Sequence, residues 1–331
     1  MKRFLLILCL ACMGHFALGQ DSSLSAPKWH LNGYIKDLQL LSFDKYFQNP
    51  RSVDIIHNRM NVKWQPSGEI TAALEIRNRL IWGSTAQALT GWTGTGTNEN
   101  YWLNLSAVWI SGERITLLSN VERLWGEYRK PKWNIRAGRQ RINWGMATTW
   151  NPNDLFNSYN FLDFDYEERA GTDAVRLQYL INAFSNVDVA ISRDANRKYI
   201  GAVRYFVNKG GYDWQLLSGY YQNQFTLGVG WAGSIKDIGF KGEAQGYLKN
   251  GDSAGRYTFT LAFDYVFKKG WYVAAAALYN SSGINSKLND WSKIDFRFSP
   301  AQLMPARWSS ILSCSKEFTP LFSASMNLVY S

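Results

Sequence analysis

The sequence predicts an all-β protein, a transmembrane antiparallel up-and-down β-barrel. Three observations indicate this fold class. Apolar and polar residues alternate in segment after segment, which is typical of strands with one apolar face. Short turns alternate with long connections, and aromatic residues gather near the ends of the predicted strands, as they do at the two interfaces of a membrane barrel.

The composition excludes three other classes of protein. Hydrophobic residues make up 46% of the 331 residues and aromatic residues 15%, so the chain has abundant apolar surface to bury and is not disordered. Outside residues 4–18 no run approaches the ~18–20 apolar residues that a membrane-spanning helix needs. Cys9 and Cys12 lie in that N-terminal segment, which leaves Cys314 alone and excludes a disulfide scaffold.

Residues 1–19 predict a signal peptide for export. Two basic residues precede an apolar run from Phe4 to Met13, and Ala17-Leu18-Gly19 supplies the small residues at which a signal peptidase cuts. The alternatives are an N-terminal membrane anchor, which so short an apolar run disfavours, and a lipoprotein attached through Cys12. We therefore expect residues 20–331 to form the mature barrel.

Fifteen strands are predicted from the alternation. The clearest row places aromatic and aliphatic residues from Tyr257 to Phe267 on one face, against Arg256, Thr258 and Thr260 on the other. Several rows reach the ~9–11 residues that a tilted membrane-spanning strand requires. The predicted strands are 30–42, 55–65, 69–82, 117–129, 133–143, 172–181, 185–194, 199–208, 212–222, 225–234, 238–249, 256–268, 271–281, 307–317 and 321–330.

The connections favour a barrel over a β-sandwich. Tight turns with Pro and Gly, such as Gln65-Pro66-Ser67-Gly68 and Lys130-Pro131-Lys132, alternate with longer links. All the tight turns therefore fall at one end of the sheet and all the long loops at the other, apart from two brief links. A soluble sandwich has shorter strands and mixed loop lengths at both ends. The longer links lie near 43–54, 83–116, 144–171 and 282–306, and the brief ones near 195–198 and 223–224.

Aromatic residues at the strand ends agree with a membrane location. Tyr and Trp prefer the two membrane interfaces, where a ring with a polar tip is half solvated. The alternative is aromatic packing in the core of a large sandwich. The residues concerned are Trp64, Trp82, Trp133, Tyr199, Trp214, Trp231, Tyr257, Trp271 and Tyr279.

Two motifs add a family resemblance. Gly138-Arg139-Gln140-Arg141-Ile142-Asn143-Trp144-Gly145, followed by Trp150-Asn151-Pro152-Asn153-Asp154-Leu155-Phe156, resembles a signature of Gram-negative outer-membrane porin-like barrels, among them the alginate-export and related families. Gly33-Tyr34-Ile35-Lys36 is similar to the first strand of such proteins, in a style typical of Bacteroidetes.

This resemblance implies a passive channel or export pore in the cell outer membrane. It implies contact with outer-membrane lipid, insertion by the barrel-assembly machinery and passage of small hydrophilic solutes, and it leaves the oligomeric state open. The alternative function is an outer-membrane barrel with a structural or adhesive role through its extracellular loops.

The strand count raises a question about closure. Single-chain bacterial barrels have an even number of strands and both termini on the periplasmic side, whereas the fifteenth predicted strand ends on the long-loop side. Either one strand is missed, which gives sixteen, or the chain is a truncated version of a larger barrel. The unbroken alternation from Phe322 to Tyr330 favours truncation, so we expect an open seam between the first and the last strand.

If the apolar rows face lipid, the opposite rows line the interior, and these are rich in basic residues. Arg and Lys around a pore attract anions, because low-dielectric walls focus the field of fixed charges. The alternative is that the arginines pair with acidic residues and brace the barrel. The candidate pore-lining residues are Arg59, Lys63, Arg77, Arg79, Arg123, Arg136, Arg139, Arg141 and Arg176.

The long link 144–171 is a candidate constriction loop. Its carboxylates stand among five aromatic residues between positions 156 and 166, more than a solvated loop needs. Folding inward would bury these rings and set carboxylates opposite the basic wall. The alternative is a lid on the extracellular surface. The candidate acidic residues are Asp154, Asp163, Asp165, Glu167 and Glu168.

Arg139 and Arg141 conflict with the phase of their strand. The strand starts at Trp133 on the lipid-facing row, and strict alternation would put both arginines there, at a cost of about 2–4 kcal/mol each at the bilayer midplane. A β-bulge reverses the phase, and Gly138 is the residue type that bulges favour. We therefore expect an irregularity near Gly138 that turns both arginines inward. The alternative is an opposite phase for the whole strand, which would leave Arg136 facing lipid.

Catalysis has little support in the sequence. His30 and His57 are the histidines outside the signal peptide, and they fall on different predicted strands. No paired Cys/His metal spacing, phosphate loop or G-x-S-x-G motif is present, so neither an enzyme nor a cofactor or metal is expected. The net charge of +10 suggests nucleic-acid binding, but the basic residues follow strands rather than a helix or an arm, and no such partner is expected.

Overall fold

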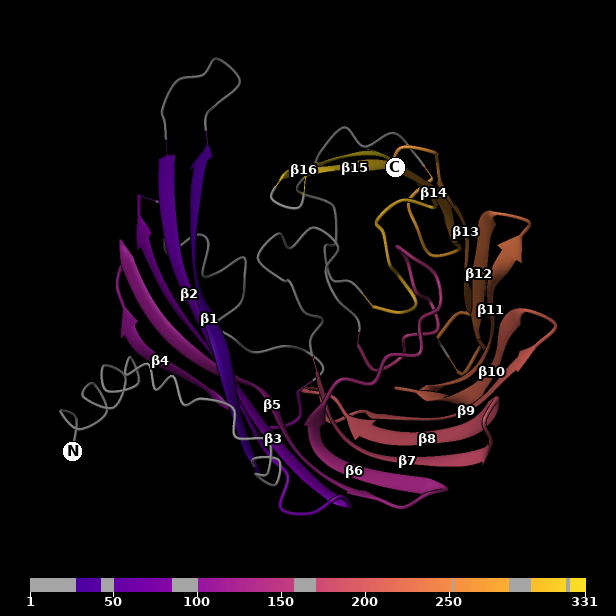
Figure 1. Cartoon of the computed structure of the whole chain (residues 1–331), viewed down its shortest axis with the longest axis horizontal. Coiled ribbons are helices and arrows are strands. Elements are labelled where there is room, and N and C mark those ends of the chain that lie inside the picture. The colour runs from indigo at the N-terminus through magenta and orange to yellow at the C-terminus, as the bar shows by residue number, and fades with distance from the viewer. Residues whose placement is uncertain are drawn as a thin grey trace.

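The computed structural model describes residues 28–42, 51–84, 101–157, 171–251, 253–285, 299–319 and 322–331. These residues form one antiparallel sheet of sixteen strands (Figure 1). In the part of the chain so described, no helix is long and apolar enough to cross a membrane. The strands are β1 (Trp29–Ser42), β2 (Arg51–Trp64), β3 (Ile70–Gly83), β4 (Ser106–Ser111), β5 (Ile115–Arg129), β6 (Trp133–Gln140), β7 (Thr172–Asn182), β8 (Ser185–Arg193), β9 (Tyr199–Lys209), β10 (Tyr212–Tyr221), β11 (Gln224–Ile235), β12 (Ile238–Tyr247), β13 (Arg256–Val266), β14 (Trp271–Asn280), β15 (Trp308–Thr319) and β16 (Phe322–Tyr330).

The strands follow one another around the sheet in chain order, which confirms the predicted up-and-down topology. β4 is the exception, because it lies off this path and pairs with the N-terminal half of β5. All fifteen predicted strands are present. The sequence reading missed β4, which falls inside the predicted long link 83–116; its six residues, Ser-Ala-Val-Trp-Ile-Ser, show too little alternation to stand out.

The two faces of the sheet differ in the sense expected for a membrane barrel. On β13 the outward residues Tyr257, Phe259 and Phe263 are 58%, 39% and 40% exposed, whereas Thr260 and Ala262 on the inner row are fully buried. The same alternation holds on β10 and β11, where exposed Trp214, Leu216, Leu227 and Val229 continue the outer rows. The outer surface is therefore apolar, the reverse of a water-soluble β protein.

The two ends of the sheet also differ as predicted. The turns between β5 and β6, β9 and β10, and β13 and β14 are tight, and they fall at the end opposite the long connections. Aromatic pairs mark both ends. Trp29 stacks on Trp64 at the short-turn end, with ring centroids 5.6 Å apart, and Tyr279 contacts Trp308 and Tyr257 at the long-loop end.

The seam between the first and the last strand is open, as predicted. Among the described strands, β1 pairs with β2 and β16 pairs with β15, and β1 and β16 do not pair with each other. Figure 1 shows the resulting gap between β1 and β2 on one side and β15 and β16 on the other.

The prediction of a β-bulge at Gly138 is wrong, because the strand register does not shift there. Gly138 does have an unusual backbone, with φ of 114°, but the pairing of β6 with β5 and with β7 passes this residue without a shift. A Cβ at Gly138 would lie 2.2 Å from the carbonyl oxygen of Leu124, so the glycine permits close approach of two strands rather than adding a residue. The register shift lies instead on β5, opposite Glu75 and Ile76.

Candidate functional site

The inner face of β2–β6 carries a ladder of charged residues, here called the ion-pair wall. It comprises Arg59, Glu75, Arg77, Glu122, Glu127 and Arg136.

Diagonal pairing resolves a repulsion within this wall. Arg59 of β2 and Arg77 of β3 are direct cross-strand partners, and like charges in that position repel. Arg59 pairs with Glu75, and Arg77 Nε lies 3.1 Å from Glu122 Oε1. Both arginines are almost completely buried. In this part of the wall the arginines therefore pair with acidic residues, which is the alternative to pore lining that the sequence left open.

The ladder continues toward β9. Arg136 Nε donates to Glu127 Oε2 at 3.0 Å. Beyond it, Asp188 of β8 is fully buried and accepts hydrogen bonds from Arg176 Nε, 2.9 Å from Asp188 Oδ1. Arg204 Nη2 of β9 lies 3.4 Å from the other carboxylate oxygen. One carboxylate thus serves two arginines.

Arg139 occupies a different place from the one predicted. Its cross-strand partners are Leu124 and Asp173, and these belong to the outward rows, so Arg139 lies on an outward row as well. It is only 2% exposed because Tyr101 covers it, with the guanidinium 3.8 Å from the ring centroid. Its carboxylate partner is Asp173, at 2.8 Å from Nε, and not a residue of the loop that follows β6.

A segment before β4 completes this buried ion pair. Arg139 Nη1 donates to the carbonyl of Val121 at 2.8 Å, and Nη2 donates to the carbonyl of Leu103. The backbone N–H of Leu103 in turn donates to Asp173 Oδ2 at 2.8 Å. A charge on an outward row is tolerated here because its hydrogen bonds and its neutralising partner are all supplied by protein.

The remaining basic candidates are dispersed. Arg79 is buried opposite His57, whose ring lies beside Tyr34 at 5.6 Å. Arg123 is buried opposite Glu75. Lys63 is exposed at the short-turn end of β2, and Arg141 is exposed just beyond the end of β6. Arg139, on an outward row, does not fit the predicted pore-lining set; that the other eight basic candidates line a pore stays a prediction.

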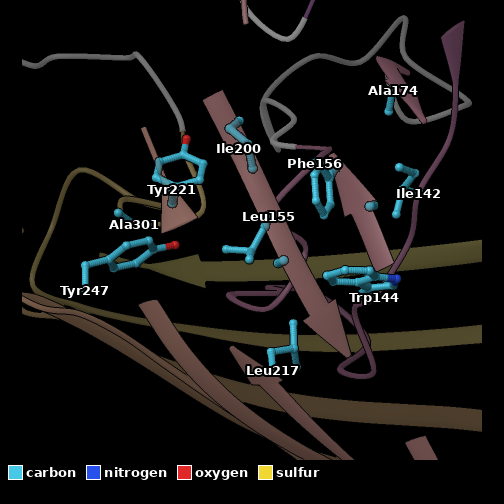
Figure 2. Packing of buried hydrophobic residues seen from close by; sticks show 12 residues of the cluster. Ile142, Trp144, Leu155, Phe156, Ala174, Ile200, Leu217, Tyr221, Tyr247 and Ala301 are labelled. Atoms are coloured by element: carbon cyan, nitrogen blue, oxygen red, sulfur yellow. The ribbon is translucent and has the colours of Figure 1, made fainter. Parts of the chain in front are cut away.

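The chain after β6 folds to the inside of the sheet. Residues 142–157, here called the inner loop, run along the concave side of β7–β14 (Figure 1). Trp144, Leu155 and Phe156 are each 1% exposed and pack against Ile200, Leu217 and other inward residues (Figure 2). This part of the link therefore folds inward, as predicted, and does not form a surface lid.

Hydrogen bonds connect the inner loop to the strand side chains. Trp144 Nε1 donates to Asp188 Oδ2 at 3.0 Å, and Gln215 Nε2 of β10 donates to the Trp144 carbonyl at 2.8 Å. Asp188 therefore joins the loop to Arg176 and Arg204 of the charged rows.

Glu243 of β12 anchors the middle of the inner loop. It is fully buried and accepts three backbone hydrogen bonds, from the N–H groups of Met146, Ala147 at 2.7 Å and Asn153 at 2.9 Å. A carboxylate that accepts several backbone N–H groups forms strong, charge-assisted bonds. This single side chain thus fixes both arms of the loop.

The far side of the loop reaches the last strands. Trp150 is 2% exposed and packs with Ala276, Leu278 and Ile311 of the inner rows of β14 and β15. Met304 joins this cluster from the connection between β14 and β15, and its carbonyl accepts a hydrogen bond from Asn280 at 2.9 Å. Two connections therefore fill the same half of the interior.

Of the five acidic candidates, Asp154 lies within the described residues. Asp154 is buried and accepts a hydrogen bond from the backbone N–H of Trp144 at 3.2 Å. It also interacts electrostatically with Arg204. Asp163, Asp165, Glu167 and Glu168 lie outside the described residues, so their predicted role at a constriction stays a prediction.

Sequence reasoning missed Glu122 and Asp173 as ion-pair partners. It placed Glu243 on an inward row and Trp144 and Trp150 within the family motif, but it did not predict that they hold the inner loop. One signal for the seat of the loop was present. Gly228 and Gly230 occupy the inner row of β11, where a Cβ would lie 2.6 Å and 3.0 Å from the side chain of Asn153. Glycines inside a strand often mark the close approach of another segment.

Within the described ranges, no cluster of three or more His, Cys, Asp or Glu side chains could hold a metal ion. No protein-family model matches the sequence, and comparison with curated proteins finds no match.

Comparison with solved structures finds outer-membrane porins. OccK11 of Pseudomonas aeruginosa matches with a TM-score of 0.52 and 8% identity, over 91% of this chain and 78% of that one. OmpF of Salmonella typhi, in complex with daunomycin, matches with a TM-score of 0.50 and 9% identity, over 91% and 89%. At such low identity the likeness concerns the fold alone. The chain has the all-β, up-and-down sheet of sixteen strands that matches those porin barrels, with its seam open.

Proposed function

We propose that the protein is an outer-membrane channel for passive diffusion or export of small hydrophilic solutes. The observation that carries the proposal is the combination of an apolar outer face, a polar inner face and a loop packed inside the curve of the sheet. A bilayer accepts strands when their backbone groups are paired within the sheet, and the porin neighbours support the same reading.

Export and location belong to this proposal. Residues 1–19 would act as the signal peptide, residues 20–331 as the barrel, and the barrel-assembly machinery as the inserting partner. Kinship with the alginate-export barrels and a Bacteroidetes origin are further proposals, which the motifs at 138–145 and 150–156 support. The porin neighbours make a non-enzymatic role the natural expectation.

We also propose that the solutes are anionic, with only weak selectivity along the wall. Arg59, Arg77, Arg136 and Arg176 each lie beside a carboxylate, and paired charges cancel much of each other's field. The excess of basic over acidic residues in the whole chain, 36 against 26, keeps the expected preference on the anion side.

Conductance across a planar bilayer tests the channel. We expect discrete current steps from the purified chain, and a reversal potential in a KCl gradient that indicates a modest preference for chloride. The absence of steps from protein that migrates as a folded barrel on unheated gels would favour the structural or adhesive role.

A matched pair of cysteine variants tests which face conducts. Asn61 and Asn58 lie on the same strand but on opposite faces: Asn61 is hydrogen-bonded to Arg59 on the inner row, and Asn58 to Asn78 on the outer row. In a Cys314→Ser background, a bulky water-soluble thiol reagent should reduce the conductance of Asn61→Cys and leave Asn58→Cys unchanged. Equal responses would contradict an inner conducting path.

A further inference from the structure

A polar cleft opens at the long-loop end of the sheet, away from the ion-pair wall. Its volume is about 660 Å³, within the range of about 300–1,000 Å³ typical of small-molecule sites. The residues around it come from four connections, those after β8, β10, β12 and β14, and from the adjacent ends of β10, β11 and β13. The cleft therefore lies at the mouth through which a solute would enter or leave.

The described lining residues of the cleft carry charge of one sign, while Asp252, in the connection after β12, lies outside the described residues. Lys198 and Arg256 line it, and no Asp or Glu is among its described lining residues. Asp194 is the acidic residue of the nearby connection, but it is buried and accepts hydrogen bonds from the backbone N–H of Lys198 at 2.8 Å and from Gln222 Nε2 at 3.2 Å. Its carboxylate thus orients the connection, and neither cation forms an ion pair with a described carboxylate.

Arg256 is held in place without losing its charge. Its Nη2 donates to Gln224 Oε1 at 2.5 Å, and its guanidinium lies 5.3 Å from the ring centroid of Tyr247. Gln224 is in turn fixed by its amide, which donates to the carbonyls of Leu248 and Ala254 at 3.0 Å and 2.9 Å. An amide orients a guanidinium but does not neutralise it, so Arg256 keeps donors and a full positive charge for a ligand.

The rest of the lining suits a hydroxylated molecule. Ser281, Ser282 and Gln222 supply hydroxyl and amide groups. Hydroxyl and amide groups donate and accept hydrogen bonds in both directions, as sugar hydroxyl groups require. Among the described lining residues, no carboxylate is present to pair with a cationic ligand.

We propose that this cleft binds a small hydroxylated organic anion, such as a sugar acid or a sugar phosphate, at the mouth of the channel. Lys198 and Arg256 hold the anionic group, and the hydroxyl and amide groups hold the remainder. The inference rests on the proposed function, since it names the class of solute that the channel takes at its long-loop end. It also places the anion preference at the mouth, because the charges of the wall are largely paired.

Binding to the purified full chain in detergent tests the site without any need for conduction. Isothermal titration calorimetry measures the binding of three probes: gluconate, glucose 6-phosphate and neutral glucose. We expect one or both anions to bind and glucose not to bind. Lys198→Gln and Arg256→Gln should each weaken binding about tenfold, the usual size of a lost charge-assisted hydrogen bond. Lys249→Gln removes the same charge from the connection after β12 but not from the cleft lining, and it should bind like the parent chain.

The outcomes separate the site from the channel. Binding of gluconate alone or of glucose 6-phosphate alone supports the site and identifies the anionic group. No binding of either anion, equal binding of glucose, or unchanged binding by Lys198→Gln overturns the inference even if the chain conducts. Lys198 is exposed, so this variant keeps the test valid if Arg256→Gln folds poorly. Selective anion binding by a chain that gives no current steps would sustain the site and overturn the proposed function.

Discussion

Two halves of the inner face are built from different chemistry. On β2–β6, long charged side chains form the ion-pair wall across neighbouring strands. On β8–β14 the inner rows carry many small and uncharged residues such as Ala202, Thr226, Gly228 and Ala262, and the inner loop packs on them. The charged residues of these rows include Asp188, Arg204 and Glu243. Where the inner rows of β8–β14 offer little side-chain volume, the inner loop fills the space.

The difference has an energetic consequence. The charges of a buried ion pair lose their hydration on folding, and the attraction of the partner offsets this loss. Removing one partner is therefore costly, whereas replacing both is often nearly neutral. Apolar packing loses stability with each atom removed, because a cavity is left. The two halves should therefore respond differently to single and to paired substitutions.

Asp188, at the junction of the two halves, should be the most sensitive position. Asp188→Ala removes the carboxylate from Arg176, Arg204 and Trp144 and leaves two positive charges close together. We expect a loss of about 3–5 kcal/mol in the free energy of unfolding, as for other broken buried pairs. Urea unfolding of the chain folded in phospholipid vesicles measures it.

Asp213→Ala provides the matched control for this substitution. Asp213 accepts one hydrogen bond, from Asn208 at 2.7 Å near a short turn. Its removal should cost less than about 1 kcal/mol. Equal losses for the two aspartates would show that the halves are not joined at Asp188.

Trp144 tests the packed half alone. Trp144→Ala removes a ring that is 1% exposed and meets Phe156 edge-on, with centroids 5.0 Å apart. We expect a loss of about 3 kcal/mol, at the lower end for a buried tryptophan, because a loop collapses more readily than a strand. Protease cleavage within residues 142–157 should also become faster. Trp144→Phe keeps the packing and loses the bond to Asp188, so it should cost about 1 kcal/mol.

Strand pattern was predictable from the sequence, and the location of the inner loop was partly so. Outward rows such as Tyr257 to Phe267 follow from a local period of two. The aromatic content of link 144–171 favoured an inward fold, which holds for residues up to 157. The anchor Glu243 was not predictable, since it lies 90 residues from Asn153 in the chain and its local pattern is that of any inward carboxylate.

Glu243 offers the next smaller effect in the packed half. Glu243→Gln keeps a carbonyl acceptor for the backbone N–H groups of the loop but removes the negative charge that strengthens three bonds. The amide also introduces donors where donors already converge. We expect a loss of about 1–2 kcal/mol in the free energy of unfolding. Glu317→Gln, on exposed surface of β15, should change it by less than about 0.5 kcal/mol.

Arg139 illustrates where sequence reasoning failed. Strict alternation places it on an outward row, and the pairing agrees, but a buried charge on that row looked too costly to accept. The compensation comes from Tyr101, Leu103 and Asp173, two of which lie more than 30 residues before it in the chain. A partner brought in from so far away leaves no local signal, so a bulge was inferred at Gly138 instead.

A double-mutant cycle tests the ion-pair wall. Arg59→Met and Glu75→Leu should each destabilise the chain, since each leaves the other partner unpaired. The double variant should lose less than the sum of the two, with a coupling of about 1 kcal/mol, because Glu75 remains partly exposed to solvent. A loss in the double variant that equals the sum of the two single losses would mean that this pair does not brace the wall.

The smallest effect is expected at the short-turn end, where Glu69 and Lys130 pair outside the membrane-spanning strands. Lys130 Nζ donates to Glu69 Oε1 at 2.7 Å, and this bond lowers the pKa of Glu69 below its ordinary value of 4.5. A lowered folded-state pKa means that the pair stabilises the fold above pH 4.5 and that this contribution is lost as the pH falls through the lowered pKa. Both groups are solvated, so the contribution is small and screened by salt. The slope of unfolding free energy against pH, measured below pH 5 at low ionic strength, should therefore be slightly shallower in Lys130→Gln than in the parent chain. The two slopes should converge in 1 M salt, where the Debye length falls to about 3 Å. A difference that survives this salt would point to the contact of Lys130 Nζ with the Tyr128 ring, 5.3 Å from its centroid, rather than to the ion pair with Glu69.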